Sequence, residues 1–207
     1  MTKSGAFIVF EGGEGAGKST QERLLAEHLA AAGLPVLRTR EPGGTPAAER
    51  IRAILLDPAS AGLDIRAEAL LFAAARGDHV ARVVRPALQV GTTVICDRYL
   101  DSSVAYQGYG RQMDPEQVRQ LSLWATFDLL PDLTVILDVE PRVGLARVSD
   151  PDRLEAEPLE YHERVRHGFL TIAAADPARY LVIDGSKAPD EIAVQVFAGV
   201  DALLASR

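Results

Sequence analysis

Apolar and polar positions alternate along the chain in two kinds of block. Short apolar runs that end at a glycine or an acidic residue predict buried strands, and longer blocks with apolar residues at helical spacing predict amphipathic helices. The predicted strands cover residues 6–11, 35–39, 91–97, 133–138 and 180–183. The predicted helices cover residues 19–32, 46–56, 66–89, 141–148, 157–175 and 189–205, with a further helix ending at residue 126.

Local signals refine the limits of three helices. Thr45 followed by Pro46 is typical of an N-cap and a first helical position. The segment that starts at Asp114 resembles a capping box before the helix that ends at Thr126. Pro86 should end or kink the long helix over residues 66–89, because proline lacks the backbone N–H that a helix interior needs.

Five buried strands separated by helices predict an α/β fold with a parallel sheet that helices cover on both faces. Ligands of such sheets bind at the carboxyl ends of the strands. The segments expected at that edge are residues 12–20, 40–45 and 97–111. Residues 1–207 are expected to form one domain, with an acidic, proline-containing lid at about residues 147–158.

Composition places the chain among ordinary globular proteins, since 47% of its 207 residues are hydrophobic and 25% are charged. The net charge of −7 argues against a nucleic-acid partner and requires any phosphate ligand to be held by local groups. Cys96, the one cysteine, lies in an apolar run and is expected to be buried. No apolar run approaches about 18 residues. We therefore expect no membrane partner and a cytoplasmic location.

A phosphate-binding loop is the strongest chemical signal in the sequence. Residues 12–19, GGEGAGKS, fit the pattern G-x-x-x-x-G-K-[ST] between a predicted strand and a predicted helix. Glycines let backbone N–H groups point at an anion, and the helix N-terminus adds positive charge. Lys18 should reach the β- and γ-phosphates and Ser19 should ligate Mg²⁺. The predicted ATP-binding residues of the loop are Gly12, Gly13, Glu14, Gly15, Ala16, Gly17, Lys18, Ser19 and Thr20.

The loop alone predicts nucleotide binding and does not separate a kinase from a switch or a motor. A kinase for an anionic acceptor must neutralise the repulsion between two phosphate groups and exclude water. The arginines available for this at the expected edge are Arg40, Arg76, Arg98, Arg147 and Arg153. Asp97 ends an apolar strand and could hold Mg²⁺ directly or through water, but Asp138 ends a similar strand and the pattern does not choose between them.

Four further segments resemble the thymidylate kinase family in its bacterial form. They read REPGGT at residues 40–45, LFAAAR at 71–76, DRY at 97–99 and SSVAYQG at 102–108, in the family's order. The resemblance implies a P-loop nucleoside monophosphate kinase fold with a lid. It implies transfer of the γ-phosphoryl group of ATP to dTMP, giving dTDP and ADP, with Mg²⁺ as cofactor and a homodimer as the assembly.

The resemblance also implies roles for individual residues. Phe72 would stack on the thymine ring, while Arg76 and Gln107 would contact its polar edge. Tyr106 would pack against C2′ of the sugar, where a ribose hydroxyl would clash, and Arg98 would bind the acceptor phosphate. The other residues predicted around dTMP are Glu11, Pro42, Ser102 and Ser103, with Glu11 near the 3′-hydroxyl or the Mg²⁺ shell.

The lid departs most from the family pattern. Asp152-Arg153-Leu154-Glu155 resembles the family's lid element, which makes Arg153 the predicted catalytic arginine beside Lys18 and Arg98. Arg147 would lie near adenine. Only five residues, 148–152, separate the two arginines, and this stretch is shorter and more acidic than the family pattern implies.

Other functions and another packing remain open from sequence. A kinase for dUMP or a deoxynucleoside is the first alternative, because Phe72 and Gln107 discriminate poorly between thymine and uracil. A P-loop ATPase switch is the second, while the absence of an N/T-K-x-D motif argues against a GTPase. The apolar face formed by Val80, Val83, Val84 and Leu88 could form the dimer interface or pack on the chain's own sheet.

Overall fold

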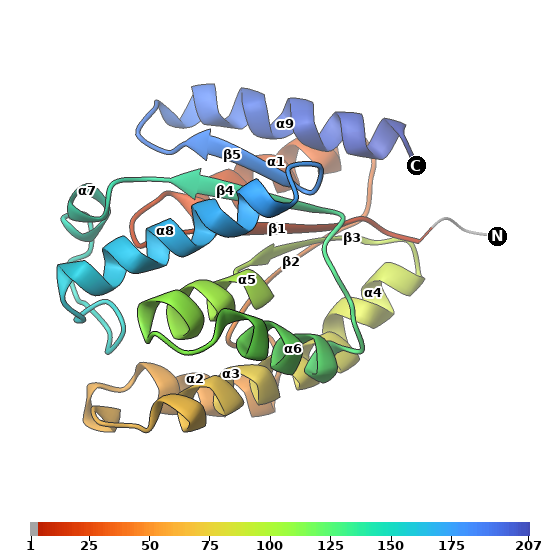
Figure 1. Ribbon diagram of the computed structural model, residues 1–207. Helices are drawn as coiled ribbons and strands as arrows, with labels where there is room; N and C mark the ends of the chain where they lie inside the picture. The colour runs from red at the N-terminus through yellow and green to blue at the C-terminus, as the bar shows by residue number, and fades with distance from the viewer. Residues whose placement is uncertain (1–3) are drawn as a thin grey trace.

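The computed structural model describes residues 4–207 and has a five-stranded sheet at its centre (Figure 1). The strands are β1 (Phe7–Gly12), β2 (Val36–Arg40), β3 (Thr93–Asp97), β4 (Leu133–Asp138) and β5 (Tyr180–Asp184). Their order is β2-β3-β1-β4-β5, and every neighbouring pair is parallel. The predicted strands and the predicted α/β fold class are confirmed.

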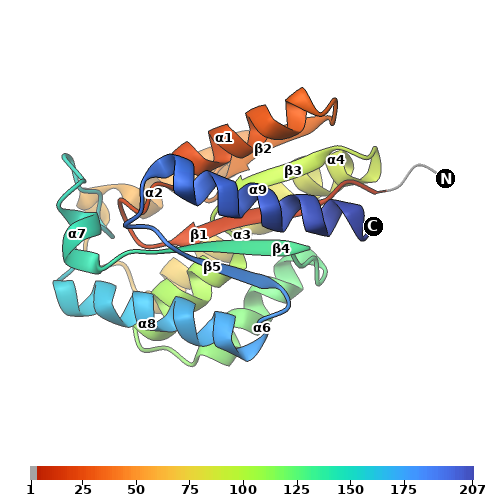
Figure 2. The ribbon, with the colours of Figure 1, turned by 90° about the horizontal axis from the view of Figure 1, so that it is seen from above.

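Helices cover both faces of the sheet (Figures 1 and 2). The structure has α1 (Lys18–Ala31), α2 (Pro46–Leu56), α3 (Ile65–His79), α4 (Arg85–Gln89), α5 (Leu100–Ser103), α6 (Pro115–Thr126), α7 (Pro141–Leu145), α8 (Leu159–Ala175) and α9 (Pro189–Ala205). One face carries α1 and α9, and the other carries α3, α4, α5, α6 and α8. Among residues 4–207, no helix combines the length and apolarity that crossing a bilayer requires.

Alternation along the central strand builds the two halves of the core. Ile8 and Phe10 pack among the residues under α1 and α9, whereas Phe7 and Val9 pack among those on the opposite face. Successive side chains of a strand point to opposite faces, so one short run serves both layers. All six residues of β1 are buried, as expected for the middle strand of a covered sheet.

The long helix predicted over residues 66–89 is present but interrupted. A π-helical segment, Val80–Val84, joins α3 to α4 just before Pro86. A wider helical turn accommodates the backbone group that a proline leaves without a donor. Thr45 caps α2 as predicted, since its hydroxyl accepts a hydrogen bond from the Ala48 N–H at 3.1 Å.

One expectation about this half of the chain needs revision, and one open alternative is settled. The sequence pattern predicts no helix between residues 98 and 113, yet α5 continues into a π-helical segment, Val104–Gly110. Burial explains it, because Val104, Ala105 and Tyr106 are each at most 5% exposed. The two packings left open for the apolar face near Pro86 are also resolved. Val80, Val84 and Leu88 pack into the chain's own core.

Candidate active site

The carboxyl ends of β1, β2 and β3 open onto one cavity of about 450 Å³. Parallel strands place the loops that follow them at the same edge of the sheet, so segments distant in sequence meet there. The lining comprises residues 14–20 of the phosphate loop and α1, together with Glu41, Pro42, Arg52, Leu56, Phe72, Asp97, Arg98, Ser102, Ser103, Tyr106, Gln107, Asp152, Leu154 and Glu155. The cavity therefore joins a loop built for phosphates to the predicted acceptor pocket.

The phosphate loop has the backbone shape that its glycines permit. Gly15 and Gly17 have φ of 62° and 91°, and a Cβ on Gly15 would lie 2.2 Å from the carbonyl oxygen of Gly144. Lys18 begins α1 and is 8% exposed. Its Nζ donates hydrogen bonds to the carbonyl oxygens of Gly12 at 3.2 Å and Gly13 at 2.9 Å. Burial lowers the Lys18 pKa, although Asp97 and Glu14 oppose this change.

Arg98 connects the phosphate loop to the acceptor side of the cavity. It directly follows β3, and its φ of 65° lies in the left-handed region. Its guanidinium donates to both carboxylate oxygens of Glu14 at 2.9 Å, to the Gly12 carbonyl at 3.0 Å and to the Ser102 hydroxyl at 3.3 Å. The same guanidinium lies over the Tyr106 ring, 5.0 Å from its centroid. This arrangement fixes a planar cation beside the loop.

Glu14 is held ionised by these neighbours. Burial opposes its ionisation, but the charges of Arg98 and Lys18 and a hydrogen bond from the Tyr106 hydroxyl outweigh that effect. The pKa of Glu14 is thereby lowered from 4.5 to about 2. The acidic side chain of the loop is therefore the counter-ion of the Arg98 guanidinium at neutral pH.

Most of the predicted acceptor residues meet in the cavity wall. Pro42 and Phe72 contribute apolar surface, while Ser102, Ser103, Tyr106 and Gln107 contribute polar groups. Tyr106 is 5% exposed and packs edge-on against Phe169, with ring centroids 6.1 Å apart. The wall therefore combines an aromatic surface suited to a flat ring with hydrogen-bonding groups suited to its edge.

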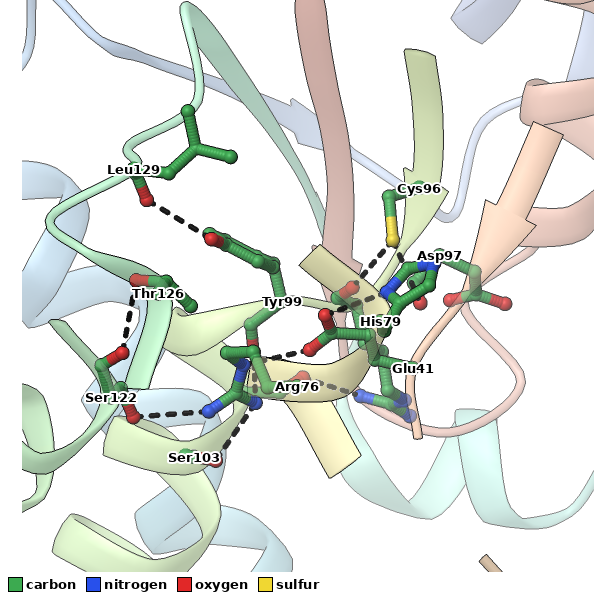
Figure 3. Close-up of polar contacts among 12 residues, drawn as sticks. Glu41, Arg76, His79, Cys96, Asp97, Tyr99, Ser103, Ser122, Thr126 and Leu129 are labelled. Atoms are coloured by element: carbon green, nitrogen blue, oxygen red, sulfur yellow. Dashed lines mark hydrogen bonds and ion pairs between the residues drawn. The ribbon is translucent and has the colours of Figure 1, made fainter. Parts of the chain in front are cut away.

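Arg76 is not among the lining residues and is buried among polar partners, three of which are the labelled Glu41, Ser103 and Ser122 (Figure 3). Its Nε donates to Glu41 at 2.7 Å. Its other nitrogens donate to the Ser122 hydroxyl, the Tyr99 carbonyl and the Ser103 hydroxyl, each at 3.0 Å. Four of its five N–H groups are thus engaged by the protein. In this structure Arg76 positions Glu41 and Ser103, which do line the cavity.

Glu11 also supports the wall from behind. It is fully buried and accepts hydrogen bonds from the backbone N–H groups of Tyr99 at 2.8 Å and Ser102 at 3.0 Å. The Ser102 hydroxyl donates to it at 2.6 Å. Burial and the nearby charge of Asp101 raise the Glu11 pKa from 4.5 to about 7. These contacts fix the start of α5 against the end of β1.

Neither of the two arginines predicted near the lid lines the cavity. The Arg153 Nε donates to the Leu55 carbonyl at 2.7 Å, and its NH1 pairs with Glu68 at 2.6 Å. Its NH2 is buried and has no hydrogen-bond partner among residues 4–207. Arg147 donates to the Gly15 carbonyl at 2.8 Å. Both side chains are thus anchored by backbone carbonyls.

Six cavity residues lie outside the predicted site residues: Glu41, Arg52, Leu56, Asp152, Leu154 and Glu155. Arg52 and Leu56 also lie outside every motif identified in the sequence, and Arg52 donates to the Pro42 carbonyl at 2.9 Å. Arg52 and Leu56 share one face of α2 because they are four residues apart. This four-residue spacing could have indicated that Arg52 and Leu56 lie on the same face of the helix. The sequence pattern around them does not show, however, that Arg52 lines a cavity while Arg50, two positions earlier, is exposed.

The oxygen donors for a divalent cation can also be identified. Ser19 and Asp97 line the cavity, and the Asp97 Oδ1 is buried without a partner in the described part of the chain. Glu22, one turn after Ser19, likewise has an unpartnered oxygen, and its pKa is raised to about 7 by burial and by Asp97. Such oxygens suit Mg²⁺. Asp138 does not compete, because Arg166 binds both its oxygens at 2.6 and 2.8 Å.

A phosphate loop and an acceptor pocket that share one cavity define a P-loop nucleoside monophosphate kinase. The thymidylate kinase family model matches residues 10–196 of this chain. The chain belongs to the thymidylate kinase family, which confirms the resemblance drawn from its motifs.

Relatives and a solved structure agree with this assignment. A thymidylate kinase of Cutibacterium acnes is 52% identical over 200 residues, which cover 97% of this chain and 98% of that protein. One of Solidesulfovibrio magneticus is 50% identical over 208 residues, covering 96% and 100%. The crystal structure of thymidylate kinase from Ehrlichia chaffeensis superposes with a TM-score of 0.79 at 36% identity and covers 96% of this chain and 99% of that chain.

The Arg98–Glu14 pair predicts a pH-dependent stability difference. Glu14→Gln should lower the free energy of unfolding at neutral pH, because it leaves Arg98 without its carboxylate. The folded-state pKa of about 2 lies below the ordinary 4.5, so the stabilisation is complete above pH 4.5 and is lost as the pH falls toward 2. Urea titrations at several pH values should show the difference between wild type and variant narrowing over this range.

Glu27→Gln is the matched control for this experiment. Glu27 pairs with Arg23 on the surface, where the two side chains are 60% and 52% exposed. Its removal should change stability by less than about 1 kcal/mol at every pH. A Glu14→Gln effect that stays constant from pH 7 to pH 3 would contradict the ionised pair described above.

Proposed function

We propose that this chain transfers the γ-phosphoryl group of ATP to dTMP, giving dTDP and ADP for the synthesis of dTTP. Family membership supports the reaction. The single structural observation behind it is the shared cavity, in which the phosphate loop faces the acceptor pocket. A donor phosphate and an acceptor phosphate bound there would lie side by side, which is the arrangement that direct transfer needs.

On the donor side, the loop and Lys18 would hold the β- and γ-phosphates of ATP. The loop's backbone N–H groups and the N-terminus of α1 favour negative charge. Ser19 and Asp97 would hold Mg²⁺, either directly or through water. When bound, Mg²⁺ supplies charge that neutralises the phosphates. Arg147, which bonds to the Gly15 carbonyl, would approach the adenine.

On the acceptor side, Phe72 would stack on the thymine ring and Gln107 would contact its edge. Tyr106 would pack against C2′ of the sugar and exclude a ribose hydroxyl, while Pro42, Ser102 and Ser103 complete the pocket. Glu11 and Arg76 would act from behind by holding Ser102 and Ser103. The geometry supports these assignments because every one of these residues lines the cavity or bonds to one that does.

Transfer requires the repulsion between the two phosphate groups to be cancelled. An oxygen of the acceptor phosphate forms a bond to the γ-phosphorus as the bond to the β-phosphate oxygen breaks. Arg98, in the cavity wall, would bind the acceptor phosphate, and Lys18 would follow the transferred group. Arg153, the lid arginine of the family motif, would add a third cation if the lid turned it from its present partners, Glu68 and the Leu55 carbonyl, toward the cavity.

A panel of acceptors tests the proposed activity. ADP release should be fast with ATP and dTMP, slower with dUMP, and at background with TMP, dCMP and dGMP. Lys18→Ala should abolish release while the protein stays folded, because the Lys18 Nζ bonds only to backbone carbonyls of its own loop among residues 4–207. Measurement by a coupled assay, with circular dichroism on each variant, is sufficient.

The outcome also separates the alternatives. Equal rates with dUMP or a deoxynucleoside would identify another small-acceptor kinase. Slow ADP release that no acceptor accelerates would identify a P-loop ATPase switch and contradict the proposal.

We propose that the enzyme acts in the cytoplasm, where ATP and nucleoside monophosphates meet.

We also propose that the chain forms a homodimer through α3 and α6. These helices pack side by side. They expose large apolar side chains: Leu70 is 57% exposed on α3, and Trp124 on α6 and the adjoining Phe127 are each 81% exposed. Exposed aromatic and aliphatic side chains gathered on neighbouring helices favour a protein interface.

Sedimentation equilibrium tests this assembly. The wild-type protein should show twice the 22.3 kDa mass of one chain, and Leu70→Glu should shift it toward the single-chain mass. Val194→Glu is the control, because Val194 is also well exposed, at 67%, but lies on α9 at the opposite face of the sheet. A wild-type mass of one chain at all concentrations would exclude the dimer.

A further inference from the structure

Glu68 is a buried carboxylate to which the proposed mechanism assigns no role. It lies on α3 one turn before Phe72 and is fully buried. Its Oε1 accepts hydrogen bonds from the Gln107 Nε2 at 3.0 Å and the Arg111 Nε at 3.2 Å. Its Oε2 pairs with the Arg153 NH1 at 2.6 Å and accepts from the Arg111 NH2 at 3.3 Å. One carboxylate therefore joins a cavity residue, a helix end and the lid.

The two arginines keep this carboxylate ionised. Burial opposes ionisation, but hydrogen bonds from Arg111, Gln107 and Arg153 outweigh it and hold the Glu68 pKa below its ordinary value. An ionised carboxylate can only accept hydrogen bonds. The group that Gln107 turns toward Glu68 must therefore be its amide nitrogen, which fixes the orientation of the whole amide.

The fixed amide leaves its oxygen for a ligand. Gln107 lines the cavity and is 1% exposed, and its Oε1 has no hydrogen-bond partner among residues 4–207. A buried acceptor without a donor is unfavourable, so a ligand that brings an N–H group would complete the site. Arg76, the other residue expected at the base edge, has four of its five N–H groups engaged by protein.

We propose that Glu68 is a positioning residue that sets base selectivity. By holding the Gln107 nitrogen, it presents the Gln107 oxygen to the cavity and so selects a base with a ring N–H donor, as at N3 of thymine or uracil. Cytosine has an acceptor at that position, which would face the oxygen unfavourably. The inference rests on the proposed function and deepens it, because it concerns which base the same cavity accepts.

The same carboxylate also links this selection to the lid. Arg153 comes from the lid segment, and its pairing with Glu68 supplies part of the charge that keeps the carboxylate ionised. Docking of the lid and orientation of Gln107 therefore depend on one side chain.

Glu68→Gln tests the role directly. A neutral amide offers both a donor and an acceptor, so Gln107 can turn over and present either end to the cavity. The ratio of the dCMP inhibition constant to the KM for dTMP should fall about tenfold, the factor expected from losing one well-made hydrogen bond to a charged partner. The KM for ATP should stay unchanged, because neither the phosphate loop nor Arg147 contacts Glu68.

Glu157→Gln is the matched control. Glu157 pairs with Arg111 at 2.6 Å and is not a hydrogen-bond partner of Gln107, so its replacement weakens the same cluster without releasing the amide. Its selectivity ratio should stay within about twofold of wild type. An unchanged ratio in folded Glu68→Gln protein, or an equal fall in Glu157→Gln, would overturn the proposal.

A second measurement uses the wild-type enzyme and so does not depend on the folding of the Glu68 variant. N3-methyl-dTMP lacks the N–H donor and should bind at least about tenfold more weakly than dTMP, whereas dUMP, which keeps it, should not show that loss. Equal binding of N3-methyl-dTMP would overturn the inference. Failure of the proposed function is recognised separately, since wild-type enzyme would then release no ADP in response to dTMP.

Discussion

The ion pair between Arg98 and Glu14 is the contact on which the cavity depends. The two residues are 84 positions apart, and the guanidinium reaches both oxygens of the carboxylate at 2.9 Å. Arg98 adopts a left-handed backbone conformation, which costs energy unless its surroundings hold it. The pair, with the bond to the Gly12 carbonyl, provides that support and fixes the end of β3 against the loop after β1.

This constraint explains how an acidic protein can bind two anions. The net charge of −7 repels phosphates at a distance, so attraction must be local. Lys18, Arg52 and Arg98 supply it within one cavity, each already partnered by backbone carbonyls or by Glu14. A buried cation needs such partners when no ligand is bound. Phosphate oxygens would then take the place of some of these acceptors when a ligand binds.

The sequence predicted the sheet and the phosphate loop because both depend on local patterns. Apolar runs placed all five strands, and the glycine spacing placed the loop at the end of β1. Side-chain partners were harder to predict. Arg153 bonds to Leu55, which lies 98 residues earlier in the chain, and pairs with Glu68. No pattern within a short stretch of sequence indicates contacts between residues so far apart. For the same reason the motif that contains Arg76 could not indicate that its N–H groups are engaged by protein.

Donor and acceptor phosphates should occupy one continuous cavity. Calorimetric titration with a bisubstrate ligand, in which a polyphosphate joins adenosine to thymidine, tests whether they do. Because the second half binds without a further loss of translational freedom, the ligand should bind much more tightly than ATP or dTMP alone, with one molecule per chain. It should also prevent both nucleotides from binding. Affinity no better than that of ATP, with dTMP still able to bind, would contradict the account.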